Sequence, residues 1–204
     1  MLDPLLRPLI DVPLLAMGRR LRAWSLSANA ITWAGFGLGI GCMIAVASGS
    51  FGIALLLLLA NRLADGLDGA VARLDGVTDL GGFLDITLDF IFYSGFVFAF
   101  AVHDPQANGL AAAFLVFSFI GTGSSFLAFA IMAARRGLAT ERRGKKSLYY
   151  LGGLTEGSET LGLFILLCLW PSAFPLAAWI FGMLCWITTA SRIAQAMDRL
   201  DGRG

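Results

Sequence analysis

Charged side chains are scarce in this chain of 204 residues. Only 14% of the residues are charged, whereas 57% are hydrophobic and the mean hydropathy is +0.77. This composition argues against an ordinary soluble domain and is typical of an integral membrane protein. The net charge is only +1, and we expect no nucleic-acid partner.

Cysteine and histidine are also scarce. The three cysteines, Cys42, Cys168 and Cys185, fall within apolar stretches and lack metal-ligand spacing. They therefore give little support to disulfides or a zinc site, and we predict packing residues. The single histidine, His103, adjoins Asp104 in a polar link, and we expect it to face solvent.

Long apolar stretches occupy most of the chain. Since a helix needs about 20 apolar residues to cross a bilayer, the sequence predicts an all-α, polytopic membrane protein with six transmembrane helices. The predicted spans are residues 28–48, 52–73, 81–102, 109–134, 149–170 and 174–197. The links are short and leave no room for a separate soluble domain. We therefore expect one membrane domain over residues 27–204.

The first 26 residues have a different character. They lack the short apolar core and small-residue cleavage site of a signal peptide. Apolar residues interleave with four arginines, and Trp24 stands at the junction with the first span. This mixture predicts that residues 1–26 form an amphipathic helical segment in the membrane interface. Pro4, Pro8 and Pro13 argue against one uninterrupted helix there.

Lysine and arginine are missing from every second link. The connections at 47–52, 103–109 and 171–175 contain none of the fifteen. By the positive-inside rule, the opposite face and both chain termini are predicted to be cytoplasmic. We expect the protein to reside in a bacterial inner (plasma) membrane.

Four aspartates stand inside the predicted spans, Asp65 and Asp68 in the second and Asp85 and Asp89 in the third. A carboxylate in that position costs roughly 2.5–3.5 kcal/mol on insertion-based scales. The spacing puts each pair on one helix face, and a turn near Val77 brings both pairs to matching depths near the cytoplasmic face. Because converging carboxylates repel one another, the pattern predicts a divalent cation site, with Mg²⁺ favoured by oxygen ligands.

Small and basic residues beside the aspartates extend this prediction to a phosphate ligand. Gly69, with Gly66 and the glycine pair at 81–82, removes side chains where a ligand could approach the helix backbone. Arg73, one turn beyond Gly69, can offer planar donors to a phosphate. The alternative is a salt-bridge cluster with Arg62 or Arg73, in which the glycines serve helix packing.

The run Asp65-x-x-Asp68-Gly69-x-x-Ala72-Arg73, followed by Gly81-x-x-x-Asp85-x-x-x-Asp89, resembles the signature of the CDP-alcohol phosphotransferases. These membrane enzymes, also called CDP-alcohol phosphatidyltransferases, join a CDP-linked donor to an alcohol. The resemblance extends to the six-span layout with an interfacial N-terminal helix. One departure is that seven residues separate Arg73 from Gly81, where the family pattern has eight. We expect this loop to differ in its contacts to the nucleotide.

The resemblance implies roles for the site residues. Asp65, Asp68 and Asp85 would bind two divalent ions, Mg²⁺ or Mn²⁺, and Asp89 would be the base for the acceptor hydroxyl and a further metal ligand. The donor would be CDP-diacylglycerol or a CDP-aminoalcohol. Residues implied to contact it are Asn29, Thr32, Asp65, Gly69, Arg73 and Thr78. A homodimer in contact with membrane lipids is also implied.

Two features of the first span leave alternatives open. Asn29 and Thr32 either donate to the donor's diphosphate or ribose, or Ser27 or Asn29 caps the helix. The glycines at 35, 37, 39 and 41 lie mid-span with no preceding strand. They therefore predict close helix packing rather than a dinucleotide-binding loop.

Candidate acceptor contacts occur later in the chain. Glu156 and Glu159 either recognise a cationic acceptor or help to activate its hydroxyl, or they pair with an interior arginine such as Arg62 or Arg192. Basic residues also gather at 135–146.

Arg135 and Arg136 begin this cluster, which either binds a phosphorylated acceptor or sets topology and contacts anionic lipid.

We predict an enzyme of phospholipid synthesis that transfers a phosphatidyl or phosphoalcohol group from a CDP-linked donor to an alcohol and releases CMP. The acceptor is left open. The alternative is an acid-lined cation transporter, which has no need for Gly69 and Arg73 at fixed offsets.

Overall fold

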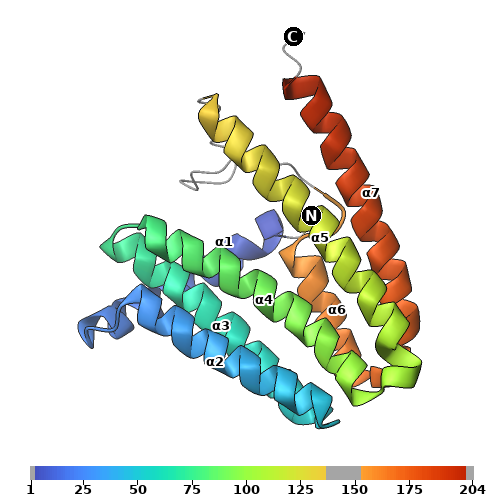
Figure 1. Ribbon diagram of the computed structural model, residues 1–204. Coiled ribbons are helices and arrows are strands. Elements are labelled where there is room, and N and C mark those ends of the chain that lie inside the picture. The colour runs from blue at the N-terminus through green and yellow to red at the C-terminus, as the bar shows by residue number, and fades with distance from the viewer. Residues whose placement is uncertain (1–2, 137–152, 201–204) are drawn as a thin grey trace.

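The computed structural model describes residues 3–136 and 153–200, and these fold into helices joined by short turns (Figure 1). The α-helices are α1 (Asp3–Ala23), α2 (Ala28–Ala47), α3 (Phe51–Asp75), α4 (Asp79–His103), α5 (Pro105–Arg135), α6 (Gly157–Leu169) and α7 (Phe174–Leu200). A short 3₁₀ helix, η1 (Pro171–Ala173), precedes α7. The described ranges contain no strand.

The helices confirm an all-α, polytopic membrane protein. Among the described residues, four segments are long and apolar enough to cross a membrane: α2, α4, α5 and Pro171–Asp198. α3 has 25 residues but carries Arg62, Asp65 and Asp68 within its apolar part, and α6 is a shorter apolar helix of 13 residues. The count of six spans therefore stays a prediction.

The predicted start of the fifth span is wrong. α6 begins at Gly157 rather than at residue 149, and residues 153–156 are not helical. A capping box between Glu156 and Glu159 fixes the first helical turn at this later point. At 1.5 Å per residue, 13 residues measure about 20 Å, which is shorter than the hydrocarbon core of about 30 Å. Residues 149–152 lie outside the described ranges.

The prediction of an interrupted N-terminal helix is also wrong, because α1 is continuous. Pro4 lies in the first turn, where its missing N–H would have no helical partner, and Pro8 and Pro13 each remove one backbone hydrogen bond. Packing along α3 supports the helix in spite of these losses. At Gly18 the two helices approach so closely that an added Cβ would stand 3.1 Å from the Cβ of Ala70.

In the first half of the molecule, α2 packs against both α3 and α4 and so holds these two helices together (Figure 1). A Cβ added at Gly35 would stand 3.0 Å from the Cβ of Ala64, and one at Gly39 would stand 2.8 Å from Cδ2 of Phe92. These two positions confirm the predicted close packing, whereas Gly37 has open space around it.

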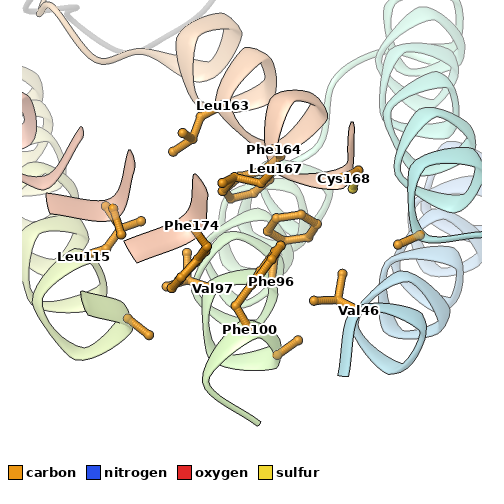
Figure 2. Packing of buried hydrophobic residues seen from close by; sticks show 14 of the residues in the cluster. Val46, Phe96, Val97, Phe100, Leu115, Leu163, Phe164, Leu167, Cys168 and Phe174 are labelled. Carbon is orange, nitrogen blue, oxygen red and sulfur yellow. The ribbon is translucent and has the colours of Figure 1, made fainter. Parts of the chain in front are cut away.

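An aromatic core joins the two halves of the molecule (Figure 2). α5 packs on α4 and α7, and α6 contacts α3. Phe96 of α4 stacks on Phe164 of α6 with ring centroids 4.0 Å apart, and Phe100 stacks on Phe174 at 4.4 Å. All four rings are fully buried, so this cluster holds α4, α6 and the start of α7 together.

The three cysteines lie in the protein interior, and the single histidine lies at its surface. Cys42, Cys168 and Cys185 are buried and form no disulfide, which confirms that they pack in the interior. His103 is exposed, as predicted, and its ring lies edge-on to Phe51 with centroids 5.1 Å apart.

Replacing Phe96 by Ala should lower the thermal unfolding midpoint of the detergent-purified protein by several degrees. The substitution removes the stack on Phe164 and leaves a cavity, a change that costs roughly 3–5 kcal/mol in protein cores. Phe98, two residues further along α4, is 64% exposed, so Phe98→Ala is a matched control that should leave the midpoint nearly unchanged. Equal shifts in both variants would contradict the placement of the core.

Candidate active site

Three aspartates from two helices meet at one point. Asp65 and Asp68 of α3 and Asp85 of α4 place carboxylate oxygens within 4.8 Å of one another. Asp68 is buried, and the other two are half-buried. Hard divalent cations prefer oxygen ligands, so these residues fit the predicted metal site.

The turn between α3 and α4 sets their relative register. α3 ends at Asp75, and Gly76 adopts φ = 102°, a backbone conformation that favours glycine. Thr78 then caps α4 by accepting a hydrogen bond from the N–H of Gly81 at 3.1 Å. Thr78, a predicted donor contact, therefore already has a structural role within the chain.

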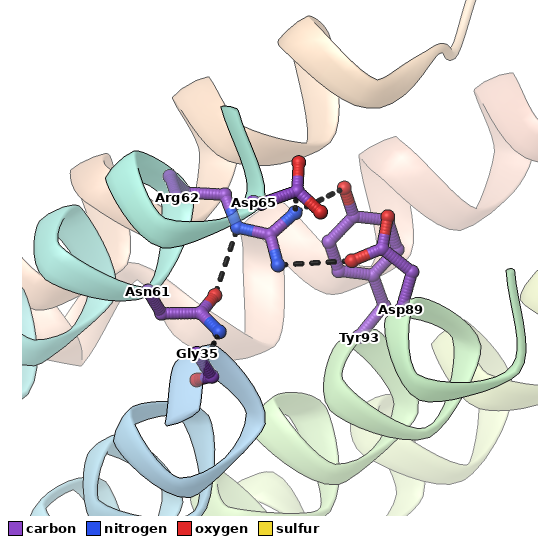
Figure 3. Close-up of polar contacts among 6 residues, drawn as sticks. All are labelled: Gly35, Asn61, Arg62, Asp65, Asp89 and Tyr93. Carbon is purple, nitrogen blue, oxygen red and sulfur yellow. Dashed lines mark hydrogen bonds and ion pairs between the residues drawn. The ribbon is translucent and has the colours of Figure 1, made fainter. Parts of the chain in front are cut away.

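Asp89 lies beside this cluster and is held by an arginine (Figure 3). Nη2 of Arg62 donates to Oδ1 of Asp89 at 2.9 Å, and Nη1 of Arg62 lies 3.8 Å from Oδ2 of Asp65. The structure thus contains one element of the salt-bridge alternative, together with three aspartates that converge as a metal site requires.

The other nitrogens of the Arg62 guanidinium also bind the protein. Nη1 donates to the Tyr93 hydroxyl at 3.1 Å, and Nε donates to Oδ1 of Asn61 at 2.8 Å. Nδ2 of Asn61 in turn donates to the carbonyl of Gly35 at 2.8 Å, so the network links α2, α3 and α4. The salt-bridge alternative named Arg62 as a partner of the aspartates, but the contacts with Asn61 and Tyr93 were not predicted. The signal for them was an arginine inside an apolar run, which is as costly as a buried aspartate.

Two residues predicted to contact the donor, Thr32 and Asp65, line a small hollow between α2, α3 and α4. Thr32 lines it together with the aspartates, and its hydroxyl donates to a backbone carbonyl one turn earlier in α2. Ser27 is the residue that caps α2. Asn29 instead faces the start of α4, where a Cβ added at Gly81 would stand 3.4 Å from its Oδ1. Asn29 and Thr32 are therefore both on the side of α2 that borders the site.

The signature glycines fall into two groups. A Cβ added at Gly69 would meet Nη1 of Arg73 at 3.5 Å, and Gly82 has open space around it, as expected where a ligand approaches. Gly66 instead receives Leu14 of α1, whose Cδ1 would stand 2.9 Å from an added Cβ. The prediction that Gly66 admits a ligand is wrong, because this glycine serves helix packing.

Glu156 and Glu159 lie at the start of α6. Glu156 is buried and accepts a hydrogen bond from the N–H of Gly153 at 3.2 Å, and Glu159 accepts one from the N–H of Glu156 at 3.2 Å. A Cβ added at Gly157 would stand 3.9 Å from the Tyr93 hydroxyl. This turn therefore borders the Arg62 network, and both glutamates take part in the helix cap.

The basic residues occupy separate places. Arg135 and Arg136 are at the end of α5, where Nη2 of Arg136 donates to the carbonyl of Leu200 in α7. The other members of the predicted basic cluster lie outside the described residues; they are Arg142, Arg143, Lys145 and Lys146.

Arg192 of α7 lines a cavity between α5 and α7, together with Ser125 and Met132 of α5. Its side chain is buried, and Nη1 donates to the carbonyl of Thr122 at 2.9 Å. The guanidinium carbon lies 5.7 Å from the ring centroid of Phe126. The cavity therefore combines an apolar wall with a fixed positive charge.

Comparisons with known proteins agree with this site. The sequence profile of the CDP-alcohol phosphatidyltransferases matches residues 25–191. Inner membrane protein YnjF of Escherichia coli (strain K12) is 49% identical over 193 residues, which cover 95% of this chain and 94% of that protein. Archaetidylinositol phosphate synthase of Pyrococcus horikoshii is 26% identical over 197 residues, or 96% and 97% of the two chains.

A solved structure has the same fold. Phosphatidylinositol phosphate synthase of Mycobacterium tuberculosis with CDP-DAG bound matches with a TM-score of 0.72 and 21% identity, over 90% of this chain and 93% of that one. At this identity the likeness concerns the fold, whereas the family assignment comes from the sequence. The matched range contains the whole signature from Asp65 to Asp89. The chain therefore belongs to the CDP-alcohol phosphatidyltransferase family and is a membrane-bound CDP-alcohol phosphotransferase.

Proposed function

We propose that this protein transfers a phosphatidyl group from CDP-diacylglycerol to the hydroxyl of a phosphorylated polyol and releases CMP. The main observation is the convergence of Asp65, Asp68 and Asp85 beside Asp89. The CDP-DAG in the mycobacterial structure supports a lipid on the donor, and the names of the two inositol phosphate synthases support the acceptor class.

Asp65, Asp68 and Asp85 would hold two Mg²⁺ or Mn²⁺ ions. When bound, such ions neutralise charge on the transferring phosphoryl group and on the leaving CMP. The helix surface at Gly69, which is bordered by the end of the Arg73 side chain, would receive the donor's diphosphate. Arg73 would offer planar donors to a phosphate.

Asn29 and Thr32 complete the donor site from the α2 side. Asn29 supplies an amide and Thr32 a hydroxyl, which suit the ribose or diphosphate oxygens. Thr32 lies on the wall of the same hollow as the aspartates, so a donor held by these residues would reach the metal ligands.

Asp89 is the base in this proposal. The acceptor oxygen attacks the phosphorus that carries the lipid, the new P–O bond forms, and the bond between the two phosphates breaks as CMP leaves with its electron pair. The acceptor proton passes to the Asp89 carboxylate. A positioned base of this kind contributes about 10²–10⁴-fold to the rate, and no covalent enzyme intermediate is needed.

The acceptor's phosphate has a candidate site in the cavity beside Arg192. Arg192 donates to Thr122, and the next residue, Gly123, packs against Phe90, the neighbour of Asp89. Among the described helices, only α5 therefore separates the cavity beside Arg192 from α4, the helix that carries Asp89. Arginine suits phosphate because its guanidinium forms planar, charge-assisted hydrogen bonds. Arg135 and Arg136, at the end of α5, add positive charge that attracts an anionic acceptor, and the α6 glutamates stay candidates for contact with its hydroxyl.

We further propose that both termini and the active site face the cytoplasm, because the lysines and arginines gather on that side of the predicted spans. The name of the Escherichia coli relative supports an inner membrane location. The apolar outer surfaces of the helices are compatible with a homodimer surrounded by membrane lipids.

Purified protein supplied with Mg²⁺, CDP-diacylglycerol and inositol 1-phosphate or glycerol 3-phosphate should release CMP, and EDTA should abolish the release. The comparison panel contains inositol, glycerol, serine, and diacylglycerol with a CDP-aminoalcohol. Release with unphosphorylated acceptors alone would contradict the acceptor class. No release with any pair, together with cation flux in liposomes, would favour the transporter.

Replacing Asp89 by Asn should reduce kcat by about 10²-fold or more, since the base is lost. Binding of Mn²⁺ and CDP, measured by calorimetry, should persist. Asp68→Asn provides the contrast, because it should weaken Mn²⁺ binding as well as turnover. Full activity in Asp89→Asn would remove this residue as the base.

Replacing Arg192 by Gln should raise the KM for a phosphorylated acceptor about tenfold or more, because a charge-assisted hydrogen bond contributes roughly 1.5–3 kcal/mol. The KM for CDP-diacylglycerol should stay constant. Arg20→Gln, on the exposed face of α1, controls for the loss of one positive charge. An unchanged acceptor KM in Arg192→Gln would move the acceptor phosphate elsewhere.

A further inference from the structure

We propose that Arg62 is a positioning residue that keeps Asp89 out of the metal ligand set and directs it toward the acceptor hydroxyl. This inference rests on the proposed function and refines it, because it separates the base from the other three aspartates. Its starting point is an asymmetry among the four carboxylates (Figure 3). Three of them converge within 4.8 Å, whereas Oδ1 of Asp89 accepts a hydrogen bond from Arg62.

Arg62 is held by the protein on all three guanidinium nitrogens. Nη2 donates to Asp89 at 2.9 Å, Nη1 to Tyr93 at 3.1 Å and Nε to Asn61 at 2.8 Å. The guanidinium carbon lies 5.1 Å from the Phe92 ring centroid and 5.4 Å from that of Tyr93, and the side chain is only 13% exposed. These contacts make Arg62 a fixed cation rather than a mobile phosphate ligand.

Close packing behind Asn61 fixes the network in place. The Asn61 amide donates to the Gly35 carbonyl of α2 at 2.8 Å. A Cβ added at Gly39 would stand 3.2 Å from Nδ2 of Asn61 and 2.8 Å from Cδ2 of Phe92. Because no space is left between α2 and this pair, Asn61 and Phe92 cannot move toward α2, and the hydrogen bond to Gly35 keeps Asn61 from moving away. Arg62 is therefore held between this pair and Asp89.

Two roles compete for Asp89, that of a metal ligand and that of a base, and the charges around it decide between them. Asp89 follows Asp85 at i, i+4 and shares its helix face, so a divalent cation held by Asp85 also attracts Asp89. A carboxylate that coordinates a cation is a poor proton acceptor, because the cation stabilises its negative charge. The charge-assisted hydrogen bond from Arg62 holds Oδ1 of Asp89, so that Oδ2 is the oxygen presented to the acceptor.

A double-mutant cycle tests this role with a measurement that does not depend on turnover. In Arg62→Met, Asp89 is released to the metal site, so Mn²⁺ affinity, measured by electron paramagnetic resonance, should rise severalfold. Adding Asp89→Asn should remove most of this gain, because most of it comes from the freed Asp89 carboxylate. The part that remains measures the loss of the Arg62 charge 3.8 Å from Asp65, and a gain that Asp89→Asn leaves unchanged would contradict the proposal. An Mn²⁺ affinity that falls or stays constant in Arg62→Met would overturn the proposal.

Turnover gives the second measurement. The kcat of Arg62→Met should fall about 10²-fold, as expected for a misplaced catalytic group, with the KM for CDP-diacylglycerol unchanged or lower. Arg62→Lys should recover part of the kcat, because an ammonium can pair with Asp89 but cannot also satisfy Asn61 and Tyr93. A kcat within twofold of wild type in Arg62→Met, or a loss of kcat that matches a loss of donor affinity, would contradict a positioning role.

Two controls separate the possible failures. If Arg62→Met does not fold, as judged by thermal melting, Tyr93→Phe removes one anchor of Arg62 and should lower kcat severalfold at constant donor KM. An unchanged kcat in Tyr93→Phe would then count against the proposal. If wild-type protein releases no CMP, the proposed function fails, and the Mn²⁺ affinity cycle still tests the pairing of Arg62 with Asp89.

Discussion

Four carboxylates within apolar helices are the constraint on which the rest of this structure depends. Asp65, Asp68, Asp85 and Asp89 cannot be solvated by lipid, and their mutual repulsion adds to that cost. The fold provides two ways to compensate these negative charges. Three of them converge so that a divalent cation can neutralise them, and the fourth is neutralised by Arg62. The proposed division between metal ligands and base therefore follows from how each negative charge is compensated.

The same constraint explains why the site is built on helices that are fixed by packing. α2 holds α3 and α4 at a set spacing through Gly35 and Gly39, and the Asn61–Arg62 network closes the gap between them. On the other side, the stack of Phe96 on Phe164 ties α4 to α6. A constellation held between packed helices keeps its geometry better than one carried on loops, and phosphoryl transfer depends mainly on positioning and charge stabilisation.

The sequence predicted those parts of the site that depend on local spacing. Helical periodicity and one turn near Val77 suffice to bring the aspartate pairs together. Contacts between distant segments were missed, because they follow from packing that no local pattern encodes. Leu14 fills the space at Gly66, Tyr93 of α4 anchors Arg62 of α3, and α6 begins at Gly157. The continuous α1 is of the same kind, since contacts with α3 outweigh the helix-breaking tendency of its prolines.

The short link between Arg73 and Gly81 shows how a departure from the family pattern can leave the aspartate cluster in place. Asp85 and Asp89 keep their helical spacing from Gly81, so the missing residue must be absorbed before α4 begins. Gly76 permits this with φ = 102°, and α1 holds the end of α3 through an ion pair of 2.6 Å between Arg22 and Asp75. The aspartates therefore converge as the signature requires. The one-residue difference therefore lies in the turn between α3 and α4, beside Arg73, rather than at the aspartates.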